Sequence, residues 1–252
     1  MVINMKEKTI IISAITAICI IIITAAVTLF PEKVNSGADK TVTEQPESTS
    51  SSTTVIPTVK APASVDKNSV EILVNAENPL PDGRKIELET LPDGHQADKR
   101  AYDSLVKMLD AASALGYNPV ICSAYRAHET QVMLFNNKIS QYKAQGYSYD
   151  EAYKAASGWV AIPGTSEHET GLAFDIVSRE NQVLDESQLE SELQQWLMEN
   201  CYDYGFILRY PQDKTEITKI NFEPWHYRYV GDNLSREIKE KGICLEEYYG
   251  QS

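Results

Sequence analysis

Residues 163–177 read PGTSEHETGLAFDIV, and this stretch decides the fold that we expect. Its first half is rich in Pro, Gly, Ser and Thr, a composition typical of a loop. Further on, Leu172, Phe174 and Ile176 alternate with the residues between them, and this period of two predicts a strand. Asp175 then lies on the face opposite the apolar side chains. Its carboxylate must therefore face solvent or a cation.

Helices and further strands are predicted on both sides of this stretch. Helical spacing of apolar residues predicts helices at residues 97–115, 128–144, 149–156 and 187–202. Short strands are expected at residues 119–125, 206–210, 217–222 and 227–230. Because the connections are short or irregular and no regular βαβ alternation is present, we expect an α+β domain. Its sheet should be small, mainly antiparallel and flanked by helices.

The first quarter of the chain does not resemble a folded domain. Residues 9–30 are almost entirely apolar and uncharged, and a helix of this length spans a bilayer core of about 30 Å. We expect residues 1–30 to form a cytoplasmic tip and a signal anchor, with a cleaved signal peptide as the alternative. Residues 31–67 are rich in Ser, Thr and Pro and are expected to form a disordered linker. Residues 68–252 would then form one domain outside a single-pass anchor in the cell membrane, or a secreted domain if the anchor is cleaved.

Charge and cysteine content exclude some classes of partner and site. The formal net charge of −13 at pH 7 argues against a nucleic-acid partner. Cys122, Cys201 and Cys244 show neither a metal-binding spacing nor a disulfide framework, and we expect them to be small buried residues. The protein is expected to be monomeric.

Two histidines and an aspartate form a candidate metal site. His168 lies in the loop that leads into the strand of Asp175, so its imidazole can reach the same point in space, and His226 would approach from a distant part of the chain. Two imidazoles and one carboxylate suit one zinc ion and leave a fourth position for water. Glu223 precedes His226 by three residues, so a turn or bulge is needed to bring both to one site. Glu223 could then act as the base towards the zinc-bound water.

At these residues the sequence resembles the VanY-type D-alanyl-D-alanine carboxypeptidases. The wider group includes LdcB-like L,D-carboxypeptidases, VanX dipeptidases and the hedgehog-like metal domain. The matching pieces, in family order, are residues 74–81 (VNAENPLP), 123–131 (SAYRAHETQ), 163–175 (PGTSEHETGLAFD) and 223–231 (EPWHYRYVG). The specific signature is Ser-x-His-x6-Asp followed by Glu-Pro-Trp-His.

The resemblance implies roles for individual residues. Zinc would be held by the two histidines and the aspartate named above, with Glu223 as general base and later as general acid. Arg126 would face the scissile carbonyl, where a fixed guanidinium stabilises developing negative charge; a surface ion pair is the alternative. Substrate contacts are implied for Ser166, Gln131, Tyr125 and Trp225. Loop capping, an exposed helical position and ordinary core packing are the competing interpretations for these four residues.

The resemblance also implies a reaction. We expect a zinc-dependent D,D-carboxypeptidase that removes the C-terminal D-alanine from peptidoglycan stem peptides or their precursors. An L,D-carboxypeptidase acting on the tetrapeptide stem needs the same metal, base and arginine, so it remains an alternative. A non-catalytic wall-binding module is the other alternative, although such a module has no need of an open metal position beside a base.

Overall fold

The strand predicted at residues 172–177 lies at the centre of the fold. The structure is a computed structural model that describes residues 66–251. Strand β4 (Ala173–Ser178) is hydrogen-bonded on one side to β3 (Pro119–Ser123) and on the other to β6 (His226–Tyr229). Strand β5 (Phe206–Leu208) completes a four-stranded sheet in which every neighbouring pair is antiparallel. The expected α+β fold with a small antiparallel sheet flanked by helices is confirmed.

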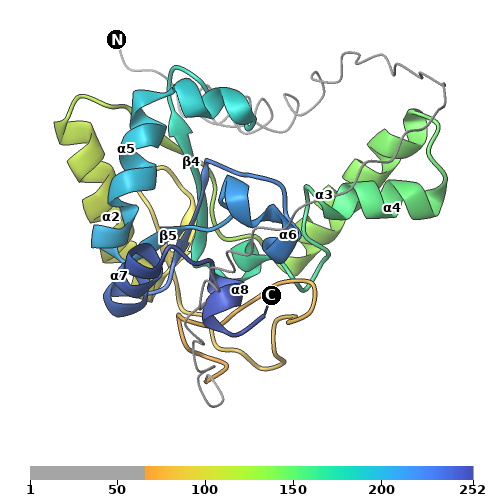
Figure 1. Ribbon diagram of the computed structural model, residues 1–252, viewed down its shortest axis with the longest axis horizontal. Helices are drawn as coiled ribbons and strands as arrows, with labels where there is room; N and C mark the ends of the chain where they lie inside the picture. Colours follow the sequence, from red (N-terminus) through yellow and green to blue (C-terminus); the bar gives the residue numbers. More distant parts are fainter. Residues whose placement is uncertain (1–65, 252) are drawn as a thin grey trace, which may run out of the picture. The chain divides into compact units, whose positions relative to one another are not determined.

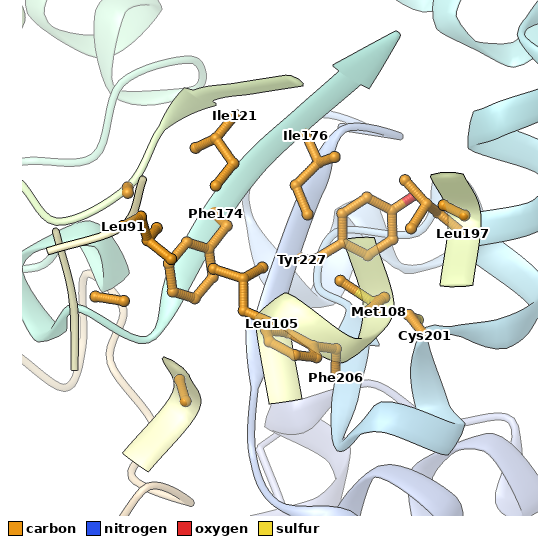
Figure 2. Close-up of a cluster of buried hydrophobic side chains, with 14 of the residues drawn as sticks. Leu91, Leu105, Met108, Ile121, Phe174, Ile176, Leu197, Cys201, Phe206 and Tyr227 are labelled. Atoms are coloured by element: carbon orange, nitrogen blue, oxygen red, sulfur yellow. The ribbon is translucent and has the colours of Figure 1, made fainter. Parts of the chain in front are cut away.

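Two helices cover one face of this sheet. Helix α2 (Lys99–Ala114) and helix α5 (Glu192–Asn200) pack against it and lie together in Figure 1. The predicted helix at residues 187–202 is divided into α5 and two flanking 3-10 turns, η3 (Glu186–Glu190) and η4 (Cys201–Tyr204). Figure 2 shows the apolar core between these helices and the sheet, which includes Leu105, Met108, Phe174, Ile176, Leu197 and Tyr227. The apolar side of β4 therefore faces this core, as its period of two predicts.

A helical hairpin projects away from the sheet (Figure 1). Helices α3 (His128–Ala144) and α4 (Tyr149–Ser157) confirm the helices predicted there. The hairpin has a small core of its own, formed by Phe135, Ile139, Ala152 and Ala156. The 3-10 turn η2 (Glu167–Thr170) follows the hairpin and leads into β4. The base of the hairpin is thus connected directly to the central strand.

Both ends of the described domain add elements that periodicity did not predict. Helices α7 (Asp232–Lys241) and α8 (Leu245–Tyr248) follow β6, and strands β1 (Leu88–Thr90) and β2 (Gln96–Asp98) form a separate two-stranded sheet before α2. A second apolar cluster lies beneath α7 and α8 and includes Leu73, Ile207, Val230, Leu234, Ile238 and Leu245. Cys201 and Cys244 are buried as expected, whereas Cys122 is partly exposed.

The strand predicted at residues 217–222 is wrong. The chain forms the short helix α6 (Thr215–Thr218) there, followed by Lys219 with φ of 60°. The backbone N–H of Lys219 donates to the carbonyl of Thr215 at 2.9 Å, which closes one helical turn. The Thr218 hydroxyl donates to the carbonyl of Ile220, so a local contact replaces a strand ladder.

The predicted membrane helix at residues 9–30 and residues 31–65 of the linker predicted at 31–67 lie outside the described residues. Within residues 66–251, no helix has both the length and the apolar character needed to cross a membrane.

Gly205 lies at a turn between the 3-10 turn η4 and strand β5. It follows η4 with φ of +78°, and its carbonyl accepts hydrogen bonds from the N–H groups of Val230 and Gly231 at 2.9 and 3.1 Å. A Cβ at Gly205 would lie 2.8 Å from Cε2 of Tyr229 and 2.9 Å from Oδ1 of Asp232. Both the backbone conformation and the space at this position require glycine.

We predict that Gly205→Ala lowers the free energy of unfolding more than Gly242→Ala does. Gly242 also has positive φ, at +61°, but a Cβ there meets nothing within 4 Å. Gly242→Ala should therefore cost only the left-handed conformation, roughly 1–2 kcal/mol. Gly205→Ala adds overlap with neighbouring atoms and should cost about 1–3 kcal/mol more. Urea unfolding followed by circular dichroism measures both, and equal losses would contradict the steric argument.

Candidate metal centre

Asp175 and His226 lie directly opposite each other on β4 and β6. Paired residues of antiparallel strands project to the same face, so both side chains lie on the face away from the Phe174 core. The distance from His226 Nδ1 to Asp175 Oδ1 is 3.1 Å. Both residues are buried. The strand register alone therefore brings one carboxylate and one imidazole together.

His168 completes the group from the turn η2. Its Nδ1 lies 2.8 Å from the carbonyl oxygen of Ala124. Because a carbonyl only accepts, Nδ1 carries the proton and Nε2 keeps a lone pair. That Nε2 lies 3.3 Å from Oδ2 of Asp175. One ligand atom from each of His168, Asp175 and His226 lies within 4.8 Å of the others, close enough to hold one metal ion.

The surroundings set the charges of these three groups. Burial lowers the pKa of His168 to about 4, and the positive charge of Arg126 acts in the same direction. Burial would raise the pKa of Asp175, but the two histidines outweigh it and hold that pKa well below its usual value. Burial would lower the pKa of His226, but the neighbouring carboxylates of Asp175 and Glu167 raise it to about 9. A cation bound between these groups would take the place of the proton on His226.

Glu223 reaches the same cluster through a tight turn. The backbone N–H of His226 donates to the carbonyl of Glu223 at 3.2 Å, which is the turn needed to bring both side chains to one site. Glu223 Oε2 lies 3.6 Å from His226 Nδ1. Burial raises the pKa of Glu223 to about 8; Asp175 adds to this effect and the charge of His226 opposes it. Glu223 is thus a buried carboxyl beside the metal ligands, able to exchange a proton near neutral pH.

Arg126 lies against the cluster and is held on three sides. Its Nη2 donates to Asp175 Oδ2 at 3.0 Å and its Nε donates to the Ser123 hydroxyl at 2.8 Å. Its Nη1 donates to Oε1 of Gln131 at 3.3 Å. These contacts hold the guanidinium in place, and the side chain remains 19% exposed to solvent.

The four residues expected to contact substrate occupy different environments. Gln131 is fully buried, and besides supporting Arg126 it donates from Nε2 to the carbonyl of Ala161 at 2.7 Å. Ser166 and Trp225 are also buried. Of the four, only Tyr125 is partly exposed. The structure therefore brings Gln131 to the site as a support for Arg126.

Three charged residues of the site were not predicted from the sequence. Glu167, Arg209 and Arg228 are buried next to His226, although charged side chains are almost never fully buried unless paired. Glu167 sits beside His168 in the recognised motif. Each arginine stands in or next to a strand-like apolar run, which is compatible with burial but does not identify the carboxylate that pairs with it.

The donor set determines which metal chemistry fits. Two imidazole nitrogens and one carboxylate oxygen match open, catalytic zinc sites, in which three protein ligands leave a position for water or substrate. The guanidinium of Arg126 and the buried carboxyl of Glu223 lie against Asp175 and His226 respectively, each from a different loop. The arrangement suits hydrolysis of a polar, unreactive bond.

Comparison with known proteins places this chain in a family. The family model described as VanY, D-alanyl-D-alanine carboxypeptidase, matches residues 94–232. A D-alanyl-D-alanine carboxypeptidase of Enterococcus faecalis is 46% identical over 177 residues, which are 70% of this chain and 64% of that protein. The putative carboxypeptidase YodJ of Bacillus subtilis is 41% identical over 152 residues, 60% of this chain and 52% of that protein. The chain spans less than two thirds of the length of these relatives.

Solved structures show the same fold. VanYB in complex with D-alanine-D-alanine has 45% identity and a TM-score of 0.67, covering 72% of this chain and 97% of that one. A VanY variant from a VanB-type resistance cassette, in complex with Zn(II), has 45% identity and a TM-score of 0.66, covering 73% and 99%. The LdcB LD-carboxypeptidase has 35% identity and a TM-score of 0.62, covering 73% and 87%. This chain therefore belongs to the VanY family of D-alanyl-D-alanine carboxypeptidases.

Proposed function

We propose that this protein is a zinc-dependent D,D-carboxypeptidase that removes the C-terminal D-alanine from peptidoglycan stem peptides. The observation that carries the proposal is the buried His168, Asp175 and His226 cluster with the Glu223 carboxyl 3.6 Å from one of its nitrogens. Membership of the VanY family and a similar structure in complex with Zn(II) support it.

The three clustered side chains would hold the zinc ion. His168 Nε2, one oxygen of Asp175 and His226 Nδ1 are the atoms that face one another. When bound, zinc polarises a carbonyl and lowers the pKa of water to about 7. The donor atoms present fit this ion because they supply two nitrogens and one oxygen without closing the site.

The remaining chemistry belongs to Glu223 and Arg126. Glu223 takes a proton from the attacking water and later delivers it to the amine of the departing D-alanine. Arg126 directs a guanidinium at the negative charge that develops on the scissile carbonyl oxygen. Ser123 and Gln131 hold that guanidinium in place, so little reorganisation is needed during the reaction. Tyr125, Ser166 and Trp225 are proposed to shape the pocket around the terminal residue.

A second activity on the same site is favoured by a specific similarity. The LdcB LD-carboxypeptidase and an L,D-carboxypeptidase DacB from Streptococcus pneumoniae share the fold at 35% and 33% identity. Removal of D-alanine from a tetrapeptide stem would use the same metal ligands, base and arginine. Because the VanYB structure with D-alanine-D-alanine is more similar, at 45% identity, we favour the D,D reaction.

The proposed place of action rests on the sequence alone. The apolar run at residues 9–30, followed by a Ser/Thr/Pro-rich stretch, supports a membrane-anchored domain on the extracytoplasmic side. Stem peptides and their precursors are found there, so the location agrees with the proposed substrate.

The reaction is tested by digesting synthetic stems. The purified protein is incubated with pentapeptide and tetrapeptide stems, with and without a chelator, and the products are identified by mass spectrometry. We expect loss of one D-alanine from the pentapeptide, no product with chelator, and recovery on adding Zn(II). Cleavage of the tetrapeptide alone would favour the L,D reaction. Equal cleavage with chelator, or none of either stem, would rule out the proposed function.

Glu223→Gln should retain zinc and lose turnover. The substitution keeps the shape of the side chain but removes its capacity to accept a proton, so kcat should fall by roughly 10²–10⁴-fold. Zinc content, measured by atomic absorption, should match the wild type because Glu223 is not among the three ligands. Glu216→Gln, on exposed α6, is the matched control and should change neither quantity. Full activity in Glu223→Gln would show that another group is the base.

Arg126→Lys should lower kcat by about 10²–10³-fold with a smaller change in KM. Lysine keeps the charge but cannot reproduce the rigid fork that contacts Ser123, Gln131 and Asp175 together. The fall corresponds to loss of one donor to a developing oxyanion. The exposed Arg236→Lys is the control. Steady-state kinetics that show a rise in KM with unchanged kcat would assign Arg126 to ground-state binding only.

A further inference from the structure

Four charged side chains form a buried group beneath the metal ligands. Arg209 donates from Nε to Glu167 Oε1 at 2.7 Å, and from Nη1 and Nη2 to the two oxygens of Glu246 at 2.8 and 2.6 Å. Arg228 Nη1 donates to Glu167 Oε1 at 2.6 Å. Two positive and two negative charges are therefore balanced out of reach of water. Burying these four charges costs desolvation energy, and stability alone is a weak reason for such a group.

The two oxygens of Glu167 have different partners. Oε1 accepts from both arginines, whereas Oε2 is buried and has no hydrogen-bond partner. Nε2 of His226 lies 3.5 Å from this oxygen. Among the described residues, it too is a buried atom without a hydrogen-bond partner. On the opposite edge of that ring, Nδ1 faces Asp175 and Glu223. Glu167 and the metal site thus lie on opposite sides of one imidazole.

We propose that Glu167 is a positioning residue for His226, which accepts the Nε2 proton of the ring and so directs the Nδ1 lone pair into the metal site. A neutral imidazole carries one proton, and its position on Nε2 leaves Nδ1 free as a donor. A carboxylate behind a ligating histidine fixes the tautomer and the ring orientation and raises the basicity of the ligand. This inference rests on the proposed metal site.

Arg209 and Arg228 keep Glu167 suitable for this role. Both guanidiniums donate to Glu167 Oε1, at 2.7 and 2.6 Å, and these contacts balance the negative charge of the carboxylate and fix its orientation. His168 is oriented by the carbonyl of Ala124 instead, so the two histidine ligands have different kinds of support.

The support extends to the beginning of the described domain. Arg228 Nη2 donates to the carbonyls of Val70 and Ile72 at 2.9 and 2.8 Å. Asn75 donates from Nδ2 to Glu246 Oε1 at 3.1 Å. Residues 74–81, which are among the pieces that resemble the family, supply no metal ligand. Through Asn75 they contact Glu246 at the far end of the charged group.

The test compares two substitutions that each remove one buried negative charge. Glu167→Gln and Glu246→Gln both leave Arg209 with a single carboxylate, so both should unfold at lower urea concentration than the wild type. Only Glu167 faces His226. Zn(II) affinity, measured by competition with a chromophoric chelator, should fall roughly 10–100-fold in Glu167→Gln and stay close to the wild type in Glu246→Gln. Co(II) loaded in place of zinc should show shifted visible absorption bands in Glu167→Gln alone.

Glu167→Asp covers the case in which Glu167→Gln fails to fold. Aspartate keeps the charge for the arginines but withdraws the carboxylate from His226, so a folded protein with weakened Zn(II) binding is expected. Wild-type Zn(II) affinity in either Glu167 variant, or an equal loss in Glu246→Gln, would overturn the inference. A wild-type protein that binds no Zn(II) would instead overturn the proposed function, so the two failures are distinguishable.

Discussion

The antiparallel pairing of β4 with β6 is the constraint on which the rest of the site depends. It sets Asp175 opposite His226 on one face and leaves Phe174 and Tyr227 paired on the other, in the core. Because side chains alternate along a strand, a slip of one residue would send a charged ligand into that core. The apolar packing of α2 and α5 therefore enforces the register, and the register assembles the ligands. The register of β4 and β6 thus determines both the packing of the core and the geometry of the candidate metal site.

Around this pair, His168 and Arg126 are held by polar partners. His168 is bonded to a backbone carbonyl and Arg126 to Ser123, and Glu167 lies behind His226 at 3.5 Å. A buried polar group without a partner costs free energy, so these contacts favour a single arrangement of the site. The site is preorganised by groups that take no direct part in the chemistry.

The sequence predicted the parts of this arrangement that depend on local pattern. The period of two in residues 172–177 located the central strand, and helical spacing located α2, α3 and α4 within a few residues. The clustering of His168, Asp175 and His226 followed from residue type and from the motif. The turn at Glu223 followed from the offset of three residues.

Other features depend on contacts between distant segments and were not predictable from pattern. Arg209 and Arg228 look like surface residues until their carboxylate partners are known, and those partners come from η2 and α8. The strand expected at residues 217–222 failed because a hydroxyl contact at Thr218 and a left-handed Lys219 close a local turn. The helix expected at residues 187–202 is interrupted at Ser191, whose backbone is extended, and the Gln188 amide before this break donates to the carbonyls of Asn181 and Val183.

The separate core of the α3–α4 hairpin has an evolutionary consequence. Phe135, Ile139, Ala152 and Ala156 form this core, and within residues 66–251 it is the first turn of α3, through Gln131, that contacts Arg126. The distal part of the hairpin is thus energetically modular. Lengthening or resurfacing its tip would alter the face that approaching polymers meet while the candidate metal site stays intact, which makes the hairpin a natural place for substrate preference to diverge.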